Sequence, residues 1–258
     1  MKIVVCIKQV PDSAARINVE NGQVTWHDAP LVVNPWDEFA IEAALVQKEN
    51  HGGEVIALSI GPESSREALK SALAMGCNDA VLISDPGLNS FDNQITSRIL
   101  AAAILKIGEA DLVIMGRQAI DTDMGTTAAQ VARILGRPAL TLASTINIDP
   151  VARSIQIERA FEEGRQVLES HLPAVISVVK DIGEPRYPSF MGIRNAQKTA
   201  IPTWSLADLG LIPVEPVVSC VELMEPPQQK ETAEMITGRS PQEIAEILVE
   251  KILTEKII

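Results

Sequence analysis

The stretch from Gly116 to Leu135 carries the residue types that bind a phosphate group. It follows the apolar run 112–115 and leads into an amphipathic helical pattern, so it has the position of a strand-to-helix loop. Glycine lets a backbone approach a ligand, hydroxyls donate hydrogen bonds, and a helix N-terminus presents N–H groups with partial positive charge. The loop residues of interest are Asp121, Asp123, Gly125, Thr126 and Thr127. The stretch indicates a phosphate-binding loop, with a simple helix cap formed by Thr126 or Thr127 as the alternative.

Strand and helix patterns alternate before this loop. Apolar strands are predicted at 2–8, 54–60, 80–84 and 111–115, and helices at 37–49, 64–75 and 93–107. This alternation predicts an α/β fold with a doubly wound, mainly parallel sheet. Ligands bind such sheets at the carboxyl ends of the strands. We therefore expect the turns after Ile7 and Ile60 to meet the loop after Met115.

The second half of the chain has a different pattern. Strands predicted at 143–148, 154–160, 165–170 and 172–179 are expected to add antiparallel strands to the sheet. Prolines interrupt the chain beyond residue 202, and Ser240–Glu243 form a capping-box pattern before a helix with its own apolar stripe. We expect a domain at 1–204 and a C-terminal arm at 205–258. The apolar stripe of the arm packs either on its own domain or on another chain.

Composition limits the partners and the compartment. The chain has 258 residues, a formal net charge of −12 and a pI near 4.8. This acidity argues against nucleic acid and against anionic membranes. No apolar run approaches the roughly 20 residues of a transmembrane helix, and the N-terminus resembles a strand rather than a signal peptide.

The cysteines and histidines indicate no metal site. Cys6, Cys77 and Cys220 are widely spaced, and they have no metal-ligand spacing with the three histidines. We expect a cytoplasmic protein with reduced thiols.

Several short motifs together resemble the β subunit of electron-transfer flavoproteins. They occur in the order of that family and span nearly the whole chain: CIKQVPD at 6–12, NPWDE at 34–38, ALAMGC at 72–77, GRQAID at 116–121, LPAV at 172–175 and EPRY at 184–187. The resemblance implies a heterodimer with a larger α subunit that carries an electron-shuttling FAD. It also implies a Rossmann-like adenine-nucleotide domain with a C-terminal arm that wraps the partner.

The family resemblance also assigns nucleotide contacts. Cys6 would lie at the end of the first strand, Asn34, Pro35, Trp36 and Asp37 around the base and ribose, and Ile60 near the adenine. The loop that cradles the phosphate would include Ala119, Asp121, Asp123, Met124, Gly125, Thr126 and Thr127, with the two carboxylates not touching the phosphate itself. The two aspartates are expected to fix the loop or bind ribose hydroxyls, and an Asx turn is an equal alternative for Asp123.

Residues 184–198 match the segment with which the family docks on an acyl-CoA-type dehydrogenase. The residues expected to bind the partner are Tyr187, Phe190, Met191 and Arg194. In relatives a leucine that inserts into the dehydrogenase aligns with Phe190, and an exposed apolar anchor suits that use. The alternative is that Phe190 packs into its own domain.

Two further positions bear on the α-subunit flavin. Glu158 and Arg159 match an acidic-basic pair that lies near it in relatives, whereas residues 160–163 depart from the pattern. Ser13 stands where some relatives have tyrosine.

The family contains two functional branches. One binds AMP in the β subunit and shuttles electrons through one FAD; the other binds a second FAD there, accepts hydride from NADH and bifurcates the electrons. The opening KQVPD and Arg117 resemble the bifurcating branch, whereas residues 122–129 lack its Gly-Pro and are closer to the AMP-binding type. Because the loop contacts the ligand directly, AMP is favoured. Alternatives outside the family are a universal-stress-type ATP-binding module and a self-contained enzyme.

Overall fold

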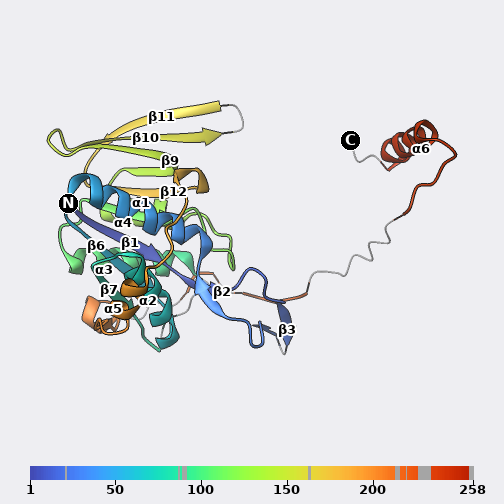
Figure 1. Cartoon of the computed structure of the whole chain (residues 1–258). Helices are drawn as coiled ribbons and strands as arrows, with labels where there is room; N and C mark the ends of the chain where they lie inside the picture. The colour runs from blue at the N-terminus through green and yellow to red at the C-terminus, as the bar shows by residue number, and fades with distance from the viewer. Residues whose placement is uncertain are drawn as a thin grey trace. The chain divides into compact units, whose positions relative to one another are not determined.

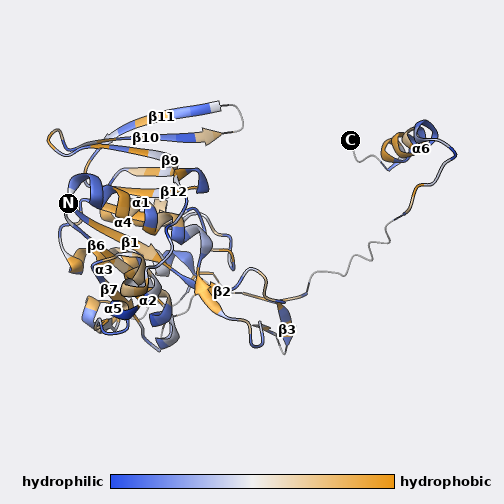
Figure 2. Ribbon diagram, in the orientation of Figure 1, coloured by the Kyte–Doolittle hydropathy of each residue, from blue (hydrophilic) through white to orange (hydrophobic). Residues whose placement is uncertain are grey.

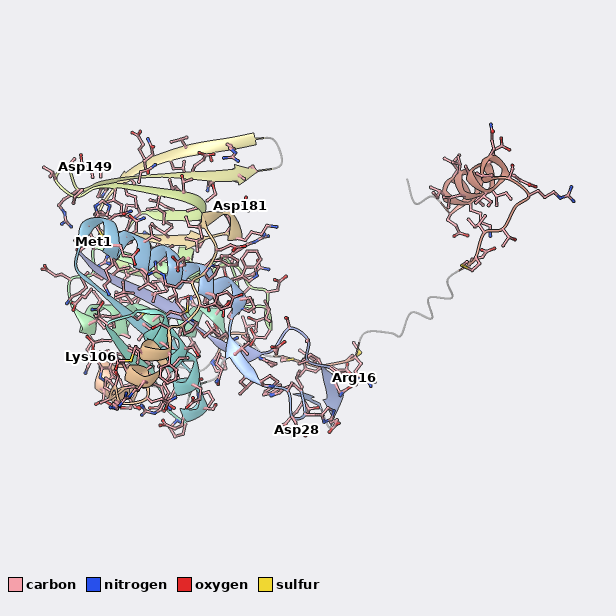
Figure 3. The ribbon with its side chains drawn as sticks, viewed as in Figure 1. Met1, Arg16, Asp28, Lys106, Asp149 and Asp181 are labelled. Atoms are coloured by element: carbon pink, nitrogen blue, oxygen red, sulfur yellow. The ribbon has the colours of Figure 1, made fainter. Side chains whose placement is uncertain are left out.

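The computed structural model describes residues 1–20, 22–86, 88, 92–161, 164–212, 216–218, 220–225 and 234–255. The chain forms two compact units, Met1–Leu223 and Met224–Ile258. Residues 205–212 lie with the first unit. The Leu206 N–H donates to Asp85 at 3.1 Å. Lys106, which is labelled in Figure 3, donates to the Asp208 carbonyl at 2.6 Å.

The first unit is built on a nine-stranded sheet with the order β11-β10-β9-β12-β8-β1-β6-β7-β13 (Figure 1). The strands are β1 (Lys2–Ile7), β6 (Glu54–Ile60), β7 (Asp79–Ile83), β8 (Leu112–Gly116), β9 (Ala139–Asp149), β10 (Ser154–Phe161), β11 (Gly164–His171), β12 (Ala174–Val178) and β13 (Thr203–Trp204). Strand order reverses at β1, which pairs in parallel with β6 on one side and β8 on the other. The predicted doubly wound α/β fold is confirmed.

The expectation that the apolar strand at 172–179 is antiparallel was wrong. Strand β12 pairs in parallel with both β8 and β9, and antiparallel pairing is confined to β9–β10 and β10–β11 in this sheet's described part. All five residues of β12 are buried. A near-continuous apolar strand of this kind is typical of an internal parallel strand.

Helices cover both faces of the sheet. They are α1 (Pro35–His51), α2 (Arg66–Met75), α3 (Asn93–Ile107), α4 (Thr127–Leu135) and α5 (Phe190–Ala196), with short 3-10 turns η1 (Glu63–Ser65), η2 (Lys180–Ile182) and η3 (Ala207–Leu209). Alternate residues of β1 point to opposite faces. Ile3 and Val5 pack with α1 and α2, whereas Val4 and Cys6 pack with α3 and α4.

Two small hairpin-like sheets extend the first unit. Strand β2 (Gln9–Pro11) pairs with β5 (Leu31–Val33), and β3 (Asn18–Glu20) pairs with β4 (Gln23–Thr25). At the predicted turn between β9 and β10, the Asp149 carboxylate accepts hydrogen bonds from the Val151 and Ala152 N–H groups at 2.9 Å (Figure 3). This Asx-type contact ends β9.

The second unit contains one described helix, α6 (Pro241–Thr254). Half of the predicted capping box is present: the Glu243 N–H donates to Ser240 Oγ at 3.2 Å, but the Glu243 carboxylate accepts the N–H of Arg239, one residue before the N-cap, at 2.7 Å. One face of α6 is apolar and the other polar (Figure 2). Leu248 and Leu253 are 45% and 64% exposed.

Candidate functional site

A cavity of about 360 Å³ opens at the carboxyl ends of β1, β6, β7 and β8. The turns after Ile7 and Ile60 and the loop after Met115 all contribute to it, as the sequence predicts for a sheet of this topology. Its wall is mainly apolar, and the side chains that give it this character are Ile60, Leu88, Ile99, Leu100 and Met115. The polar residues of the lining include the basic Lys8 and Arg117, the acidic Asp37 and Asp85, and the uncharged Ser84, Asn93, Thr96, Gln118, Thr122 and Thr127. A flat apolar group with a polar or anionic end suits such a cavity.

Asp37, on the first turn of α1, joins two of the strand ends beneath the cavity. Its carboxylate accepts the Lys8 N–H at 2.8 Å and the Gly116 N–H at 3.2 Å. Burial raises the pKa of Asp37 to about 7, while these donors and an Asn34 hydrogen bond act in the opposite direction. Gly116 is required here, because a Cβ would lie 2.5 Å from the carboxylate and 2.6 Å from the Trp36 carbonyl.

Asn34 fixes the loop that follows β8. Its side chain is fully buried, donates to the Gln118 carbonyl at 2.9 Å and accepts the Ile120 N–H at 3.1 Å. Both functions of one amide are therefore used to hold the loop backbone. Asn34 also ends the preceding segment, since its own N–H donates to the Lys8 carbonyl at 2.8 Å.

The two loop aspartates are occupied by protein partners. Asp121 forms an ion pair with Lys8, with an Nζ–Oδ2 distance of 2.6 Å. Asp123 accepts a hydrogen bond from the Gln118 amide and has a left-handed backbone, φ 52°. Their carboxylates thus fix the loop, which is one of the two roles considered for them above.

Helix α4 begins at the cavity. Thr126 is its N-cap residue, but its side chain forms no capping hydrogen bond, so the simple-cap alternative fails for Thr126. Instead Thr126 Oγ1 accepts from Asn93 at 2.7 Å, and the Thr127 hydroxyl donates to Asn93 at 2.9 Å. These bonds join the starts of α3 and α4. The first turn of α4, which carries the partial positive charge of the helix N-terminus, faces the cavity.

The structure brings some of the predicted nucleotide contacts together and not others. Those that line the cavity are Cys6, Asp37, Ile60, Ala119, Met124, Gly125 and Thr127. Those that do not line it are Asn34, Pro35, Trp36, Asp121, Asp123 and Thr126. Burial raises the pKa of the Cys6 thiol, with Asp37 adding to the effect, so Cys6 is a neutral wall residue.

Sequence reasoning missed several lining residues. Lys8 and Ser84 directly follow strands, so the rule that ligands lie at strand ends already points to them. Asn93 gives no such signal, because it begins a helix that the chain reaches only after a long connection. Arg117 lines the cavity and lies over the Trp36 ring at 5.5 Å, a contact that no local pattern predicts.

The predicted partner-binding residues lie outside the cavity. Residues 184–198, called the docking segment below, include the short helix α5, which the sequence did not predict. Tyr187 is 95% exposed, Phe190 80% and Met191 57%, and Arg194 is also exposed. The alternative that Phe190 packs into its own domain is therefore wrong. Ile193 adds a fourth exposed apolar side chain.

The acidic-basic pair on β10 is engaged within the chain. Glu158 forms an ion pair with Arg165 at 2.5 Å, and Arg159 lies over the Phe161 ring at 4.5 Å. Residues 162–163, which depart from the family pattern, lie outside the described residues.

The described residues contain no cluster of three or more His, Cys, Asp or Glu able to hold a metal ion. Within the same described ranges, no helix combines the length and apolar character needed to cross a membrane.

Comparison with known proteins decides the family. A family model described as "Electron transfer flavoprotein domain" matches residues 22–209. The chain belongs to the electron transfer flavoprotein β-subunit family, which includes FixA. It is similar to the caffeyl-CoA reductase-Etf complex subunit CarD of Acetobacterium woodii, with 39% identity over all of both chains.

Two further relatives agree with this family. The FixA protein of Azorhizobium caulinodans is 39% identical over 85% of this chain and 79% of its own. The electron transfer flavoprotein subunit beta of Clostridium acetobutylicum is 38% identical over 81% of this chain and 80% of its own. The chain is thus a β subunit of an electron transfer flavoprotein, and the alternatives of a universal-stress-type module and a self-contained enzyme are set aside. Membership implies association with a flavin or nucleotide, an α-subunit partner and interaction with a dehydrogenase.

Proposed function

We propose that this β subunit binds AMP in the cavity, while the α subunit holds most of the FAD. The heterodimer would pass electrons between an acyl-CoA-type dehydrogenase and an acceptor, in the cytoplasm. The observation that carries the AMP assignment is the cavity itself: an apolar wall at Ile60 and Met115 meets polar groups beside the start of α4. The apolar wall suits the adenine ring, and the polar groups at the start of α4 suit a phosphate.

The residues around the cavity have different roles in the proposed binding of AMP. Ile60, Leu100 and Met115 supply an apolar surface for a purine. Gly125 and Thr127 lie where the N-terminus of α4 favours an anion, and Lys8, which pairs with Asp121, also lines the cavity. Asn34, Asp37 and Asp121 hold the loop without lying on the ligand, apart from the cavity-facing part of Asp37. AMP bound this way has a structural role, and redox chemistry belongs to the flavin at the subunit interface.

A second FAD in the same cavity is the alternative function. It is favoured by the printed name of CarD, a subunit of a caffeyl-CoA reductase-Etf complex, and by Arg117 at the cavity wall. In that case the cavity would hold the adenine end of the FAD, and a flavin accepting hydride from NADH would lie beyond the phosphates.

The deciding experiment is the cofactor content of the co-purified heterodimer. Denaturation followed by chromatography of the released nucleotides gives the ratio of FAD to AMP. We expect one FAD and one AMP per heterodimer, with no reduction of flavin by NADH. Two FAD without AMP, together with flavin bleaching by NADH, would establish the alternative instead.

The other partner proposals concern two surfaces. We propose that the C-terminal arm packs on the α subunit through the apolar face of α6, and that the docking segment binds the dehydrogenase. Exposed Leu248 on α6, and exposed Tyr187 and Phe190 on the docking segment, support the two assignments.

A further inference from the structure

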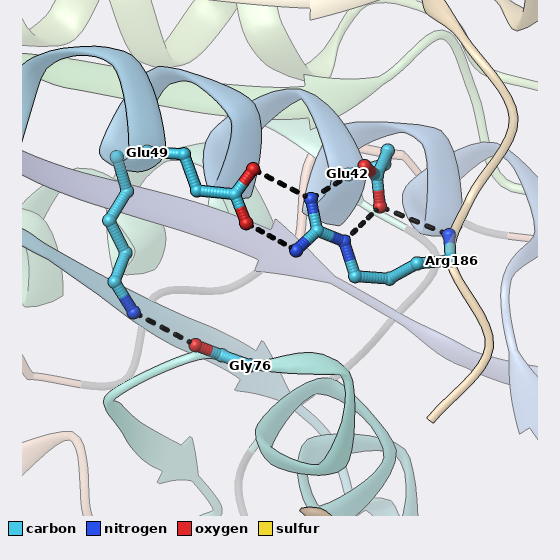
Figure 4. Close-up of polar contacts among 5 residues, drawn as sticks. Glu42, Glu49, Gly76 and Arg186 are labelled. Atoms are coloured by element: carbon cyan, nitrogen blue, oxygen red, sulfur yellow. Dashed lines mark hydrogen bonds and ion pairs between the residues drawn. The ribbon is translucent and has the colours of Figure 1, made fainter. Parts of the chain in front are cut away.

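Arg186 fixes the start of the docking segment to α1. Its Nε and one terminal nitrogen each donate to a Glu42 carboxylate oxygen at 2.8 Å, and its backbone N–H donates to the same carboxylate at 3.0 Å. The guanidinium also donates to both Glu49 oxygens, at 2.5 and 3.2 Å (Figure 4). Two carboxylates bound in this way fix both the position and the plane of the guanidinium.

The α1 face that receives Arg186 is itself well fixed. Glu42 and Glu49 lie seven residues apart, which places them on one side of a helix. The Glu42 side chain is only 12% exposed. Beside them Lys48 donates to the Gly76 carbonyl at 3.1 Å, which links α1 to the end of α2 (Figure 4).

Gly192 fixes the second half of the docking segment to α2. A Cβ at this position would lie well inside van der Waals distance of the Ala74 carbonyl oxygen, so α5 packs on α2 more closely than any other residue allows. Ser189 caps α5 by accepting the Gly192 N–H at 2.9 Å, and Ala196 is buried at the other end. Pro185 and Pro188 further restrict the backbone.

Large apolar side chains of the same segment point to solvent. Tyr187, Phe190, Met191 and Ile193 are 95%, 80%, 57% and 47% exposed. The backbone is therefore anchored by buried or paired groups, while the Tyr187 and Phe190 side chains are almost fully exposed and those of Met191 and Ile193 about half exposed. A loop that folded for its own stability would bury these side chains instead.

We infer that Arg186 and Gly192 are positioning residues, which hold the docking segment in its partner-binding shape before a dehydrogenase arrives. This inference rests on the proposed function of the segment. A segment that is already ordered loses less conformational entropy on association, so affinity rises without an added contact. Arg186 faces α1 and Gly192 faces α2, so neither needs to touch the partner.

The test uses the complete heterodimer with its cofactors, in variants Arg186→Lys and Gly192→Ala. Lysine keeps the charge but cannot bond to two carboxylates in one plane, and alanine forces α5 away from α2. We expect faster amide hydrogen exchange across residues 190–197 in both variants. We also expect the KM for the heterodimer to rise about tenfold, with kcat unchanged, in reaction with a purified acyl-CoA dehydrogenase that reacts with the wild type. Flavin content and absorption should match the wild type.

Two further variants separate the possible outcomes. Arg153→Lys alters another surface ion pair, to Asp111 at 3.1 Å, and should change neither readout. Phe190→Ala should raise KM while leaving exchange unchanged, because it removes a contact and not an anchor. If Gly192→Ala lowers the flavin content, Arg186→Lys and Glu49→Gln decide the question, since neither changes the contact of Gly192 with Ala74.

The outcomes distinguish the positioning role of Arg186 and Gly192 from the proposed docking function of the segment. A wild-type KM for Phe190→Ala would show that the segment is not the docking site, and the inference would fail with it. A raised KM for Phe190→Ala with wild-type exchange and KM for Arg186→Lys and Gly192→Ala would overturn the positioning role alone.

Discussion

Buried polar side chains at the cavity act mainly on the protein and not on the ligand. Asn34 uses its amide to hold the backbone at Gln118 and Ile120, and Asp37 joins Lys8 to Gly116. The family motif assigns both residues to the nucleotide. It does not distinguish a ligand contact from a loop anchor, because that difference depends on hydrogen bonds between distant parts of the chain.

Lys8 lines the cavity and also pairs with Asp121, so its loss should weaken nucleotide binding both directly and through the loop. We predict that Lys8→Met lowers AMP affinity by roughly ten- to a hundredfold, the size of one hydrogen bond to a charged group. Calorimetry on nucleotide-stripped protein measures the change. Lys70→Met is the control, because Lys70 forms an exposed ion pair with Glu67 on α2 and does not line the cavity. Equal affinities for the Lys8 variant and the wild type would remove Lys8 from the site.

The raised pKa of Asp37 predicts a pH-dependent stability. An acid with a higher pKa in the folded than in the unfolded state binds more protons when folded, so the free energy of unfolding falls as pH rises from about 4 to about 7. The change from 3.8 to about 7 corresponds to about 4 kcal/mol at most. Asp37→Asn lacks this titration. Urea unfolding at pH 5 and pH 8 should therefore show the wild type losing stability relative to the variant, and parallel pH profiles would contradict the assignment.

The local sequence pattern predicts the helices and strands of this chain better than it predicts how they pair and pack with one another. The strand at 54–60 and the helix at 93–107 have the bounds expected from apolar periodicity and flanking glycines. The direction of β12 was missed because the antiparallel pattern of the strands before it was extended to it, although its continuous apolar run is typical of an internal parallel strand. Helix α5 was missed because two prolines precede it and Gly192 lies inside it; its stability comes from α2, a contact that sequence periodicity does not contain.

The junction between β8 and α1 gives a prediction about elements. We predict that Gly116→Ala lowers the free energy of unfolding by about 1–3 kcal/mol, because the added methyl group meets the Trp36 backbone and the Asp37 carboxylate. Chemical unfolding measures it. Gly61→Ala is the control for stability, since its methyl group meets the Ser65 side chain, which has a rotatable hydroxyl. A smaller loss for Gly116→Ala than for Gly61→Ala would contradict the close packing of β8 on α1.

At the scale of the whole molecule, the two compact units divide the proposed tasks. The cavity and the docking segment belong to Met1–Leu223, whereas the amphipathic helix α6 belongs to Met224–Ile258. Folding, nucleotide binding and assembly with the α subunit should therefore be separable by truncation.

Removal of residues 224–258 tests that separation. We predict that the truncated chain keeps the far-ultraviolet circular dichroism of the sheet and binds AMP, but no longer forms a stable complex with the α subunit. Sedimentation of the two subunits mixed at micromolar concentration measures assembly. A truncated chain that still sediments as a heterodimer would show that residues 224–258 are dispensable for assembly.

Helix α1 contacts both the cavity and the docking segment, and this limits which insertions and deletions the helix can accept. Asp37 on its first turn lies at the cavity, and Glu42 and Glu49 further along hold Arg186. One inserted residue between positions 38 and 41 would turn everything after it by about 100° and advance it by about 1.5 Å. The glutamates would then face away from Arg186 while the cavity stayed intact. Exposed positions of this helix can therefore change in composition. Its length between Asp37 and Glu42 is fixed, because the rotation about the helix axis from one residue to the other decides whether Glu42 meets Arg186.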